Sequence, residues 1–342
     1  MRPVYDLSMS DLATLLEEWG QPAYRASQIW QGLYQQYWQT PKQFTNLPVA
    51  LRDRLAENFQ YNLLVPISIQ NSSDGKTVKT LFKLLDGKAI ESVLMCYEKR
   101  NTLCISTQAG CAMGCVFCAT GQMGFKRHLS SGEIVAQVMY YAALLHEKDE
   151  LVTNIVVMGM GEPFHNYDNT MAAIDRLNDS LGYNFGARRF TISTVGLIPA
   201  IRRFAAEKRQ VNLAISLHAA DDLLRSSMLP VNKRYPIDEL LEACREYIAE
   251  TGRRITFEWA LVNGVNDTPE QAHLLVKKIK GMLCHVNAIP LNPTHGYSGQ
   301  ATTRERADKF KEVLISSGIP CTIRLRRGID IQAGCGQLAI EV

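Results

Sequence analysis

The sequence lacks any apolar run of the roughly 18 residues that a membrane-spanning helix needs. Its first residues place Asp6 and Asp11 where a secretory signal would have its apolar stretch, so export is not expected. There is also no large excess of one charge, because 37 Lys and Arg face 34 Asp and Glu, and the net charge of +3 neither requires nor excludes a nucleic-acid partner. We therefore expect a cytoplasmic protein with no membrane association.

A disordered or low-complexity composition is absent as well. Of the 342 residues, 46% are hydrophobic and 21% are charged, which is usual for a folded globular protein. At roughly 150 residues per domain, the length predicts about two domains, or one large α/β barrel with an appendage. No glycine-rich dinucleotide-binding fingerprint follows the first strand expected in the α/β part, so a nucleotide-binding sheet of that type is not favoured.

Residues 1–62 are predicted to form a small helical domain. Apolar residues recur at helical spacing from Asp11 to Trp19, with Ser10 as a plausible N-cap and Gly20 as a stop. Further helices are expected over 24–37 and 48–59. The region carries five basic and six acidic residues, so its charge alone gives it no nucleic-acid role.

Residues 63–100 change to a period of two. Three segments alternate apolar and polar residues, and Asp74-Gly75 and Asp86-Gly87 separate them with the turn chemistry of hairpins. This pattern predicts a short antiparallel β connector rather than a second core.

From 101 to 342, expected strands and helices alternate. Six such repeats predict parallel strands joined by crossover helices, and the number suits a partial (β/α)6 barrel better than a flat doubly wound sheet. The fold class is therefore α/β. The expected strands are 102–107, 154–160, 189–194, 211–217, 255–261, 286–291 and 322–326, and the expected helices are 133–147, 168–179, 197–207, 237–251, 269–281 and 303–317.

Three of the nine cysteines lie within eight residues, in the pattern C-x3-C-x2-C formed by Cys111, Cys115 and Cys118. They follow the first expected barrel strand, on the carboxyl-end face where barrel enzymes hold their chemistry. Three thiolates in one loop can ligate three irons of a 4Fe–4S cluster and leave the fourth iron open. The alternatives are a structural zinc site with His128 as an irregular fourth ligand, or three packed core cysteines. No second cysteine pair exists for a zinc site, and both alternatives are less favoured because the spacing and the loop position agree with a cluster.

Polar or small residues recur at the carboxyl ends of the expected strands. Each alone is more often a turn former or a helix cap, but their co-location at one edge favours ligand binding. The residues are Gly161 and Glu162 after the second strand, Ser193 at the third, Ser216, Leu217 and His218 at the fourth, and Asn292 after the strand at 286–291.

Two further cysteines stand apart from the triplet. Cys104 lies on the first expected barrel strand, where a free cysteine is usually a small packing residue. Cys335 is flanked by Gly334 and Gly336, and such a loop suits a closely approached backbone better than a core position.

These motifs together resemble the radical S-adenosylmethionine (SAM) superfamily, and within it the RlmN/Cfr family of RNA methyltransferases, RlmN most closely. The likeness covers nearly the whole chain. The matching segments are Leu103–Cys111, Ala119–Phe125, Val157–Pro163, Ile192–Gly196, Ser216–Ala219, Pro230–Asn232 with Pro236, Gly264–Asp267 and Cys335–Leu338.

The resemblance implies cofactors and roles for individual residues. Cys111, Cys115 and Cys118 would hold one 4Fe–4S cluster, and SAM would contact Gly161, Glu162, Ser193, Ser216, Leu217, His218 and Asn292. Cys335 would carry a methyl group as S-methylcysteine. Cys104 would resolve the product by a transient disulfide with Cys335, and Glu91 would act as general base. Glu91 otherwise reads as an outward glutamate on an exposed strand face.

The implied activity is methylation of carbon 2 of adenine, at adenosine 2503 of 23S ribosomal RNA and adenosine 37 of transfer RNA, using two SAM per turnover. A Cfr-like enzyme that methylates carbon 8 would use the same residues. Two readings from other classes remain: a non-catalytic zinc or iron–sulfur RNA-binding module, and a radical SAM enzyme acting on a small metabolite. The implied partners are ribosomal and transfer RNA and an electron donor such as flavodoxin or ferredoxin, with residues 1–62 as an accessory RNA-binding domain on a monomer.

Two further features bear on the substrate. Six basic pairs recur along the chain, and about half are expected to be solvated helix surface while the rest contact phosphates. They are Lys126-Arg127, Arg188-Arg189, Arg202-Arg203, Lys233-Arg234, Arg253-Arg254 and Arg326-Arg327. The loop 294–300 departs from the usual family version, and Gly334 stands where alanine is usual.

Overall fold

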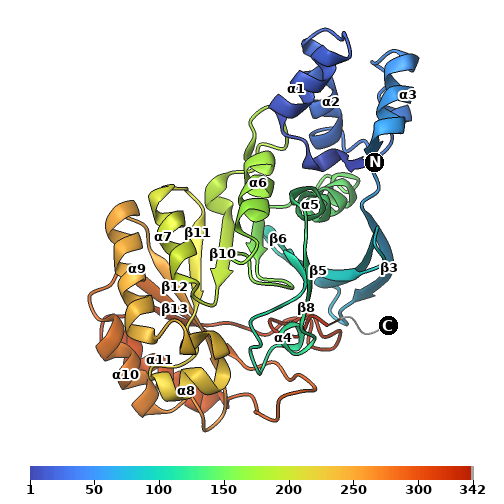
Figure 1. Ribbon diagram of the computed structural model, residues 1–342. Helices are drawn as coiled ribbons and strands as arrows, with labels where there is room; N and C mark the ends of the chain where they lie inside the picture. The colour runs from blue at the N-terminus through green and yellow to red at the C-terminus, as the bar shows by residue number, and fades with distance from the viewer. Residues whose placement is uncertain (340–342) are drawn as a thin grey trace.

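The N-terminal region is helical, as predicted. The computed structural model describes residues 1–339, and α1 (Met9–Glu18), α2 (Tyr24–Tyr34) and α3 (Val49–Asn58) form a small group at one end of the molecule (Figure 1). Two 3-10 turns, η1 (Val4–Asp6) and η2 (Pro41–Gln43), and the short strands β1 (Arg2–Pro3) and β2 (Phe59–Gln60) complete it. The N-cap of α1 is Ser8 and not Ser10, because Asp11 lies three residues after Ser8 and completes a capping box.

This helical region is tied to the barrel by polar contacts at its base. The Asp6 carboxylate accepts from the backbone N–H of Gly132 (2.6 Å) and from the Ser131 hydroxyl (3.0 Å). From a barrel helix, Arg176 donates to the carbonyls of Leu7 (2.9 Å) and Asp6 (2.7 Å). The N-terminal chain is therefore anchored on the helices that follow the first two barrel strands.

A single open sheet of ten strands forms the centre of the described chain, in the order β14-β13-β12-β11-β10-β9-β6-β5-β4-β3. The seven strands from β6 to β14 pair in parallel. They are β6 (Arg100–Cys104), β9 (Asn154–Val157), β10 (Phe190–Thr194), β11 (Asn212–Ser216), β12 (Ile255–Leu261), β13 (Cys284–Pro290) and β14 (Cys321–Ile323). Since the sheet does not close, the architecture is the expected partial barrel.

The segment predicted as a connector joins this sheet. Strands β3 (Leu64–Asn71), β4 (Thr77–Leu84) and β5 (Ala89–Tyr97) pair antiparallel, and β5 pairs with β6. The buried side chains of β4 and β5 share the barrel core, including Phe82, Ile90 and Val93. The antiparallel pairing was predicted correctly, and the segment forms no second core, because the β5–β6 hairpin continues the barrel sheet.

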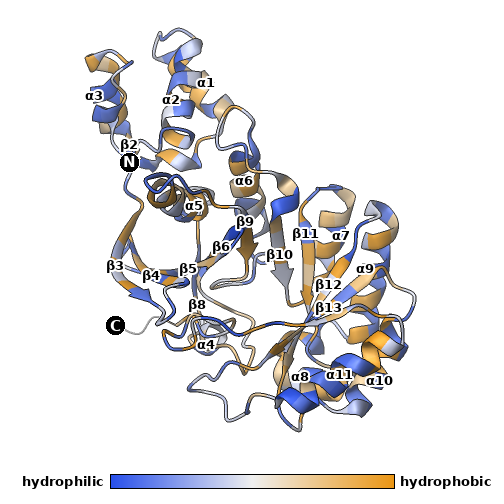
Figure 2. Ribbon diagram, turned by 180° about the vertical axis from the view of Figure 1, so that it is seen from behind, coloured by the Kyte–Doolittle hydropathy of each residue, from blue (hydrophilic) through white to orange (hydrophobic). Residues whose placement is uncertain are grey.

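The crossover helices cover the outer face of the sheet (Figure 2). Their buried apolar residues belong to the same hydrophobic core as those of the sheet. They are α5 (Ser131–His146), α6 (Tyr167–Asn178), α7 (Ile198–Ala206), α9 (Ile237–Thr251), α10 (Pro269–Ile279) and α11 (Arg304–Ser316). Side-chain caps start several of them, such as Ser130 on α5 and Thr268 on α10, and Gly252 ends α9 with φ +65°. No helix of the described chain is both long and apolar enough to cross a membrane.

The loop that carries the cysteine triplet is more structured than predicted. Strand β6 ends at Cys104, and a separate ribbon of β7 (Gln108–Gly110) and β8 (Phe125–His128) encloses the three cysteines together with α4 (Ala119–Gln122). Helix α8 (Asp222–Met228) and the turns η3 (Ala187–Arg189) and η4 (Pro230–Lys233) were also not predicted. These elements are too short to show a hydrophobic period.

Arg225 of α8 ties the carboxyl ends of two strands together from inside the protein. It is fully buried, and burial lowers the pKa of its guanidinium to about 10. Its Nε donates to the carbonyl of Leu217 (3.0 Å), its Nη1 to Asn232 Oδ1 (2.8 Å), and its Nη2 to the carbonyls of Val195 (2.7 Å) and Ser216 (3.1 Å). One side chain thus satisfies four acceptors beside the strand ends.

We predict that Arg225→Met lowers the free energy of unfolding by about 3 kcal/mol, because it leaves several buried acceptors without a donor. Urea unfolding followed by circular dichroism measures this change. Arg202→Met is the matched control, since Arg202 is about half exposed and forms a surface salt bridge with Glu246, and it should cost less than about 1 kcal/mol. Equal midpoints for the two variants would contradict the role of Arg225.

Candidate active site

Two neighbouring cavities open at the carboxyl ends of the parallel strands. The inner cavity, of about 140 Å³, is lined by Cys115, Cys118, Glu162 and the ends of β10 to β13. The thiol cavity, of about 70 Å³, is lined by Cys104 and by the chain that follows β14. Cys335 lines both cavities, as do Asn292 and Leu338. The two cavities therefore meet at Cys335.

The three clustered cysteines lie in one tightly packed loop. Cys111 and Cys115 are buried and Cys118 is partly buried. The loop is fixed by backbone bonds from Cys111 N–H to the Gly124 carbonyl (3.1 Å) and from Val116 N–H to Met228 (3.0 Å). Gly121, just after the third cysteine, packs closely on the loop, since a Cβ there would lie 3.0 Å from the backbone of Cys115. A glycine at this position thus lets the chain fold back closely on the loop.

The donor set fits the 4Fe–4S cluster that the spacing predicts. Burial raises the pKa of the Cys111 thiol to about 12 and that of Cys115 well above its usual value, and the neighbouring thiols and Glu162 raise that of Cys115 further. Such thiols stay protonated at neutral pH unless a cationic group replaces their protons. Within residues 1–339 no three His, Cys, Asp or Glu side chains converge on a single metal ion. A 4Fe–4S cluster does not require three side chains around one metal ion, since each cysteine ligates a different iron.

His128, the possible fourth zinc ligand, is engaged elsewhere. Its Nδ1 lies 3.0 Å from Gln108 Nε2, which also lies 3.1 Å from His165 Nδ1. The His128 ring packs against Phe125 and His165. His128 does not line the inner cavity, so the zinc alternative loses its fourth ligand.

Gly161 and Glu162 form part of the inner cavity, next to the cysteine loop. Gly161 has φ +105°, and a Cβ there would lie 2.6 Å from Gln108. The Glu162 carboxylate is buried and accepts from the backbone N–H groups of Phe164 (3.0 Å) and Val195 (2.9 Å). Burial raises the pKa of Glu162 to about 7, although these bonds oppose the shift. A cationic amine in the cavity would favour the ionised carboxylate.

Polar groups of β10 and β11 line the opposite wall. The Oγ atoms of Ser193 and Ser216 lie 3.3 Å apart. His218 is buried with φ +60°, and its Nδ1 accepts from the N–H of Ala260 (2.9 Å), so the proton of the neutral ring lies on Nε2. Burial lowers the pKa of His218 to about 3. Leu217 does not line the cavity, because its side chain is buried and its backbone N–H donates to Glu258.

Asn292 connects this wall to Cys335. Its Nδ2 donates to the carbonyl of Cys335 (3.0 Å), while its buried Oδ1 has no hydrogen-bond partner. A hydrogen-bond donor on a bound ligand would satisfy this unpaired acceptor in the cavity wall. Gly334 packs against the same amide, since a Cβ at this position would lie 2.6 Å from Asn292 Nδ2. Glycine at position 334 thus permits this contact.

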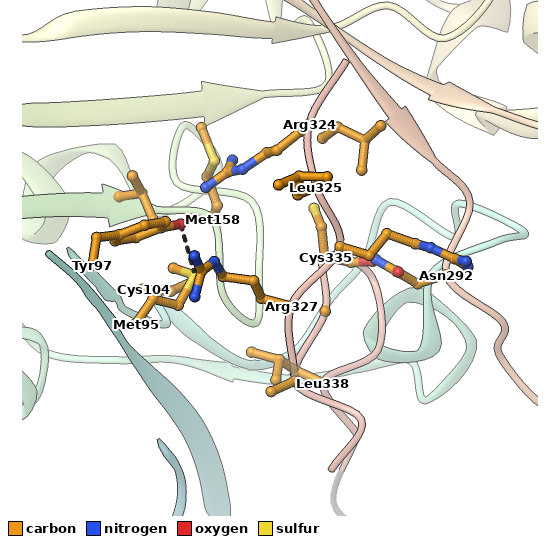
Figure 3. Close-up of a pocket in the computed structure, with 15 residues that line it drawn as sticks. Met95, Tyr97, Cys104, Met158, Asn292, Arg324, Leu325, Arg327, Cys335 and Leu338 are labelled. Carbon is orange, nitrogen blue, oxygen red and sulfur yellow. Dashed lines mark hydrogen bonds between the residues drawn. The ribbon is translucent and has the colours of Figure 1, made fainter. Parts of the chain in front are cut away.

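The thiol cavity brings Cys104 and Cys335 to one space, together with Tyr97 and Arg324 (Figure 3). Burial raises the pKa of Cys104 to about 12, Cys335 raises it further, and Arg324 opposes the shift. Cys335 is exposed to the cavities, yet the surrounding protein still raises the pKa of its thiol to about 11. Both cysteines are free, so the expected disulfide is not present in this structure.

Glu91 lies in a different cavity from the two thiols. It is buried on β5, which rules out the exposed strand face, and its Oε1 lies 3.1 Å from Lys79 Nζ. Its Oε2 accepts from the N–H of Ala339 (2.9 Å). The cavity it lines contains Lys79 and Asp330 but neither cysteine.

Several residues of the site were missed by sequence reasoning. Glu258 of β12 lines the inner cavity, burial raises its pKa to about 7, and its Oε2 accepts from Asn287 Nδ2 (2.7 Å). Tyr97 and Arg324 line the thiol cavity. An acidic residue inside an otherwise apolar strand was a signal for Glu258, whereas nothing in the local pattern distinguishes Tyr97 or Arg324.

We predict that replacing any one of Cys111, Cys115 or Cys118 by Ala removes most of the bound iron and sulfide. Three thiolates are already one fewer than four irons, so losing another exposes a second iron. Iron and sulfide analysis after anaerobic reconstitution measures this. Cys244→Ala is the matched control, because Cys244 is buried in α9 away from the site and should leave the content unchanged. A triple variant that keeps its full iron would refute the cluster assignment.

Comparison with known proteins supports this arrangement. Residues 105–276 match the model of the Radical SAM superfamily, and residues 3–60 match the Ribosomal RNA large subunit methyltransferase N-terminal domain. A crystal structure of a radical SAM methyltransferase from Sphaerobacter thermophilus is 50% identical, covers 100% of both chains and superimposes with a TM-score of 0.98.

Curated relatives match over almost the whole length. The dual-specificity RNA methyltransferase RlmN 1 of Myxococcus xanthus is 49% identical over 339 residues, which is 99% of this chain and 94% of that protein. A probable dual-specificity RNA methyltransferase RlmN of Chloroflexus aurantiacus is 49% identical over 349 residues, covering 99% and 93%. With its partial barrel, cysteine loop and N-terminal helices, this chain belongs to the radical SAM superfamily and, within it, to the RlmN family of RNA methyltransferases.

Proposed function

We propose that this enzyme methylates carbon 2 of adenine in RNA, at adenosine 2503 of 23S ribosomal RNA and adenosine 37 of transfer RNA, through a methylated cysteine. One observation supports the proposal most. Cys335 lines the inner cavity with Cys115 and Cys118 and also lines the thiol cavity with Cys104. A thiol in that position can receive a carbon on the side of the inner cavity. On the side of the thiol cavity, Cys104 can then release the carbon from it.

The chemistry of adenine explains why two thiols are needed. Carbon 2 of the ring is not nucleophilic, so it does not attack the methyl group of SAM directly. Bound at Cys111, Cys115 and Cys118, the cluster with SAM would supply a radical that takes hydrogen from a methyl group. The remaining tasks, which are to carry the carbon and release it, belong to side chains of this chain.

Cys335 is proposed to carry the methyl group. Its segment is held against the cysteine loop by the bond from Ala119 N–H to the Gly336 carbonyl (2.7 Å), and Asn292 holds the Cys335 carbonyl. After one SAM has methylated the sulfur, loss of a hydrogen atom would let the S-bound carbon join carbon 2 of adenine. The backbone bonds keep that carbon at the junction of the two cavities.

Cys104 is proposed to release the product. Attack of the Cys104 thiolate on the Cys335 sulfur would break the bond to the transferred carbon and leave a disulfide between the cysteines. The released carbon would take up a proton to become the methyl group, and one electron of the radical adduct would return to the cluster held by Cys111, Cys115 and Cys118. An external reductant would then restore the two thiols. The attack requires a thiolate, and the cation of Arg324 opposes the rise that burial imposes on the pKa of Cys104. The two free thiols are the state in which such a cycle begins.

Glu91 is proposed to remove the ring proton of the adduct. In the described structure its carboxylate is held by Lys79 and by the N–H of Ala339, in a cavity beside the thiol cavity. Met95 and Tyr97, on the same face of β5 as Glu91, do line the thiol cavity. The role therefore requires the contact with Ala339 to open when RNA is bound.

The proposal includes partners outside the chain. Each cycle would need electrons from a donor such as flavodoxin or ferredoxin, and RNA substrates place the enzyme in the cytoplasm, where we propose that it acts as a monomer. The names of the relatives, which describe dual-specificity RNA methyltransferases, support both ribosomal and transfer RNA as substrates.

We predict that the reconstituted enzyme, with SAM and a reductant, forms 2-methyladenosine in ribosomal and transfer RNA. Digestion to nucleosides, chromatography against both methyladenosine standards and mass spectrometry measure the product. Cys335→Ala should give no methyladenosine while keeping its cluster iron. Formation of 8-methyladenosine would replace the proposed regiochemistry with the Cfr-like one, and methylation of neither RNA would refute the function.

We predict that Cys104→Ala accumulates a covalent complex with RNA through a methylene bridge from Cys335. Without the attacking thiol the bond between sulfur and carbon stays intact. The adduct should resist denaturing electrophoresis and disappear after nuclease digestion. Cys96→Ala is the matched control, since Cys96 is partly buried one strand away and should turn over normally. Free methyladenosine from Cys104→Ala at the wild-type yield would mean that Cys104 is a packing residue.

A further inference from the structure

Leu325 stands exposed at the mouth of the thiol cavity. Its side chain is 83% exposed, yet it lines the cavity with Cys104 and Cys335 (Figure 3). Single exposed leucines are common on protein surfaces and need no explanation by themselves. This one differs in its position, because it lines the cavity that holds both Cys104 and Cys335.

The backbone around Leu325 is held at both ends. Arg324 N–H donates to the Ala288 carbonyl (2.8 Å), which continues the pairing of β14 with β13. After Leu325, Gly328 has φ +59° and packs against Thr77, where a Cβ would lie 2.8 Å from that side chain. The leucine is thus presented by an anchored segment.

Basic side chains surround the same opening. Arg324, Arg326 and Arg327 line the cavity, and no Asp or Glu of the described chain does. Arg326 donates to the Leu291 carbonyl (3.4 Å), and the Arg327 guanidinium lies 4.4 Å from the ring centre of Tyr97. Arg127, Arg202 and Arg203 of the other basic pairs form salt bridges with nearby carboxylates. The positive charge at this mouth therefore suits phosphates.

An adenine in folded RNA cannot reach Cys335 while it is stacked between its neighbours. Enzymes that modify a base extrude it, and an apolar side chain inserted between base steps separates the stack. We propose that Leu325 is this wedge: it enters the stack where the target adenine leaves, while Arg326 and Arg327 hold the flanking phosphates. The proposal rests on the RNA-modifying function proposed above and adds how the substrate is opened.

The test compares a structured RNA with a relaxed one. An RNA hairpin with 2-aminopurine at the target position reports extrusion as a rise in fluorescence, with no methylation needed. Bound to the reconstituted wild-type enzyme, it should brighten. With Leu325→Ala most of that rise should be lost. Methylation of the adenine hairpin should slow roughly tenfold in kcat/KM, because the side chain that separates the stacked bases is missing. A short single strand whose adenine is already unstacked should be methylated at the wild-type rate by both proteins.

Three further variants serve as controls. Leu325→Met keeps an apolar wedge and should behave as wild type. Leu151→Ala removes a leucine that is 60% exposed and precedes the amino end of β9, whereas Leu325 follows the carboxyl end of β14, so this variant should change nothing. Arg326→Gln should weaken binding to both RNAs and lower the slope of log affinity against log salt by about one.

The outcomes separate the wedge from the proposed function. Wild-type fluorescence and rate for Leu325→Ala would overturn the wedge. Equal slowing on both RNAs would overturn it too, and slower cluster reduction in that variant would instead identify the opening as the docking site of the electron donor. If the wild-type enzyme brightens the hairpin, Leu325→Ala does not, and neither RNA is methylated, the proposed function fails and the wedge stands.

Discussion

Parallel pairing from β6 to β14 is the constraint on which the site depends. Each crossover helix returns the chain to the same edge of the sheet, so all seven strands direct their carboxyl ends to one rim. Cys104, Thr194 and Ser216 are the last residues of their strands, and the Gly161-Glu162 motif follows β9 closely. Residues as far apart in the chain as Cys115 and Cys335 thereby share one cavity. The antiparallel strands β3 to β5 extend the same sheet and place Tyr97 beside Cys104.

The chain after β14 completes the site by crossing this rim. Hydrogen bonds to Gly336 from Ala119 and to Cys335 from Asn292 place one thiol between two cavities. Small residues make the close approach possible, because neither Gly334 nor Gly336 has a side chain to separate the segments. A single cysteine can therefore face the cofactor side and the second thiol in turn. The N-terminal helices α1 to α3 lie at the other end of the molecule from α4 and β8 (Figures 1 and 2), so they leave this opening uncovered.

Burial sets the charge of the site. The carboxylates of Glu162 and Glu258 have pKa values raised to about 7, and the imidazole of His218 stays neutral. Near pH 7 these two carboxyl groups thus exchange between the protonated and the ionised form. A cationic group in the cavity would favour the ionised form. Arg225 supplies a fixed cation behind the same strand ends. Its four acceptors are backbone or amide oxygens, so it holds the geometry without neutralising the acids.

The sequence by itself determined the class of fold, the alternation of strands and helices to within a few residues, and the cysteine loop. It did so because periodicity and the spacing C-x3-C-x2-C are local properties of the chain. Residues at strand ends were predicted as a group for the same reason, once the strands were taken as parallel. The tertiary structure alone decided that β5 joins the barrel sheet, that Glu91 is buried beside Lys79 in a separate cavity, and that Arg324 faces the two thiols. Each of these depends on contacts between residues far apart in the chain, which no local pattern records.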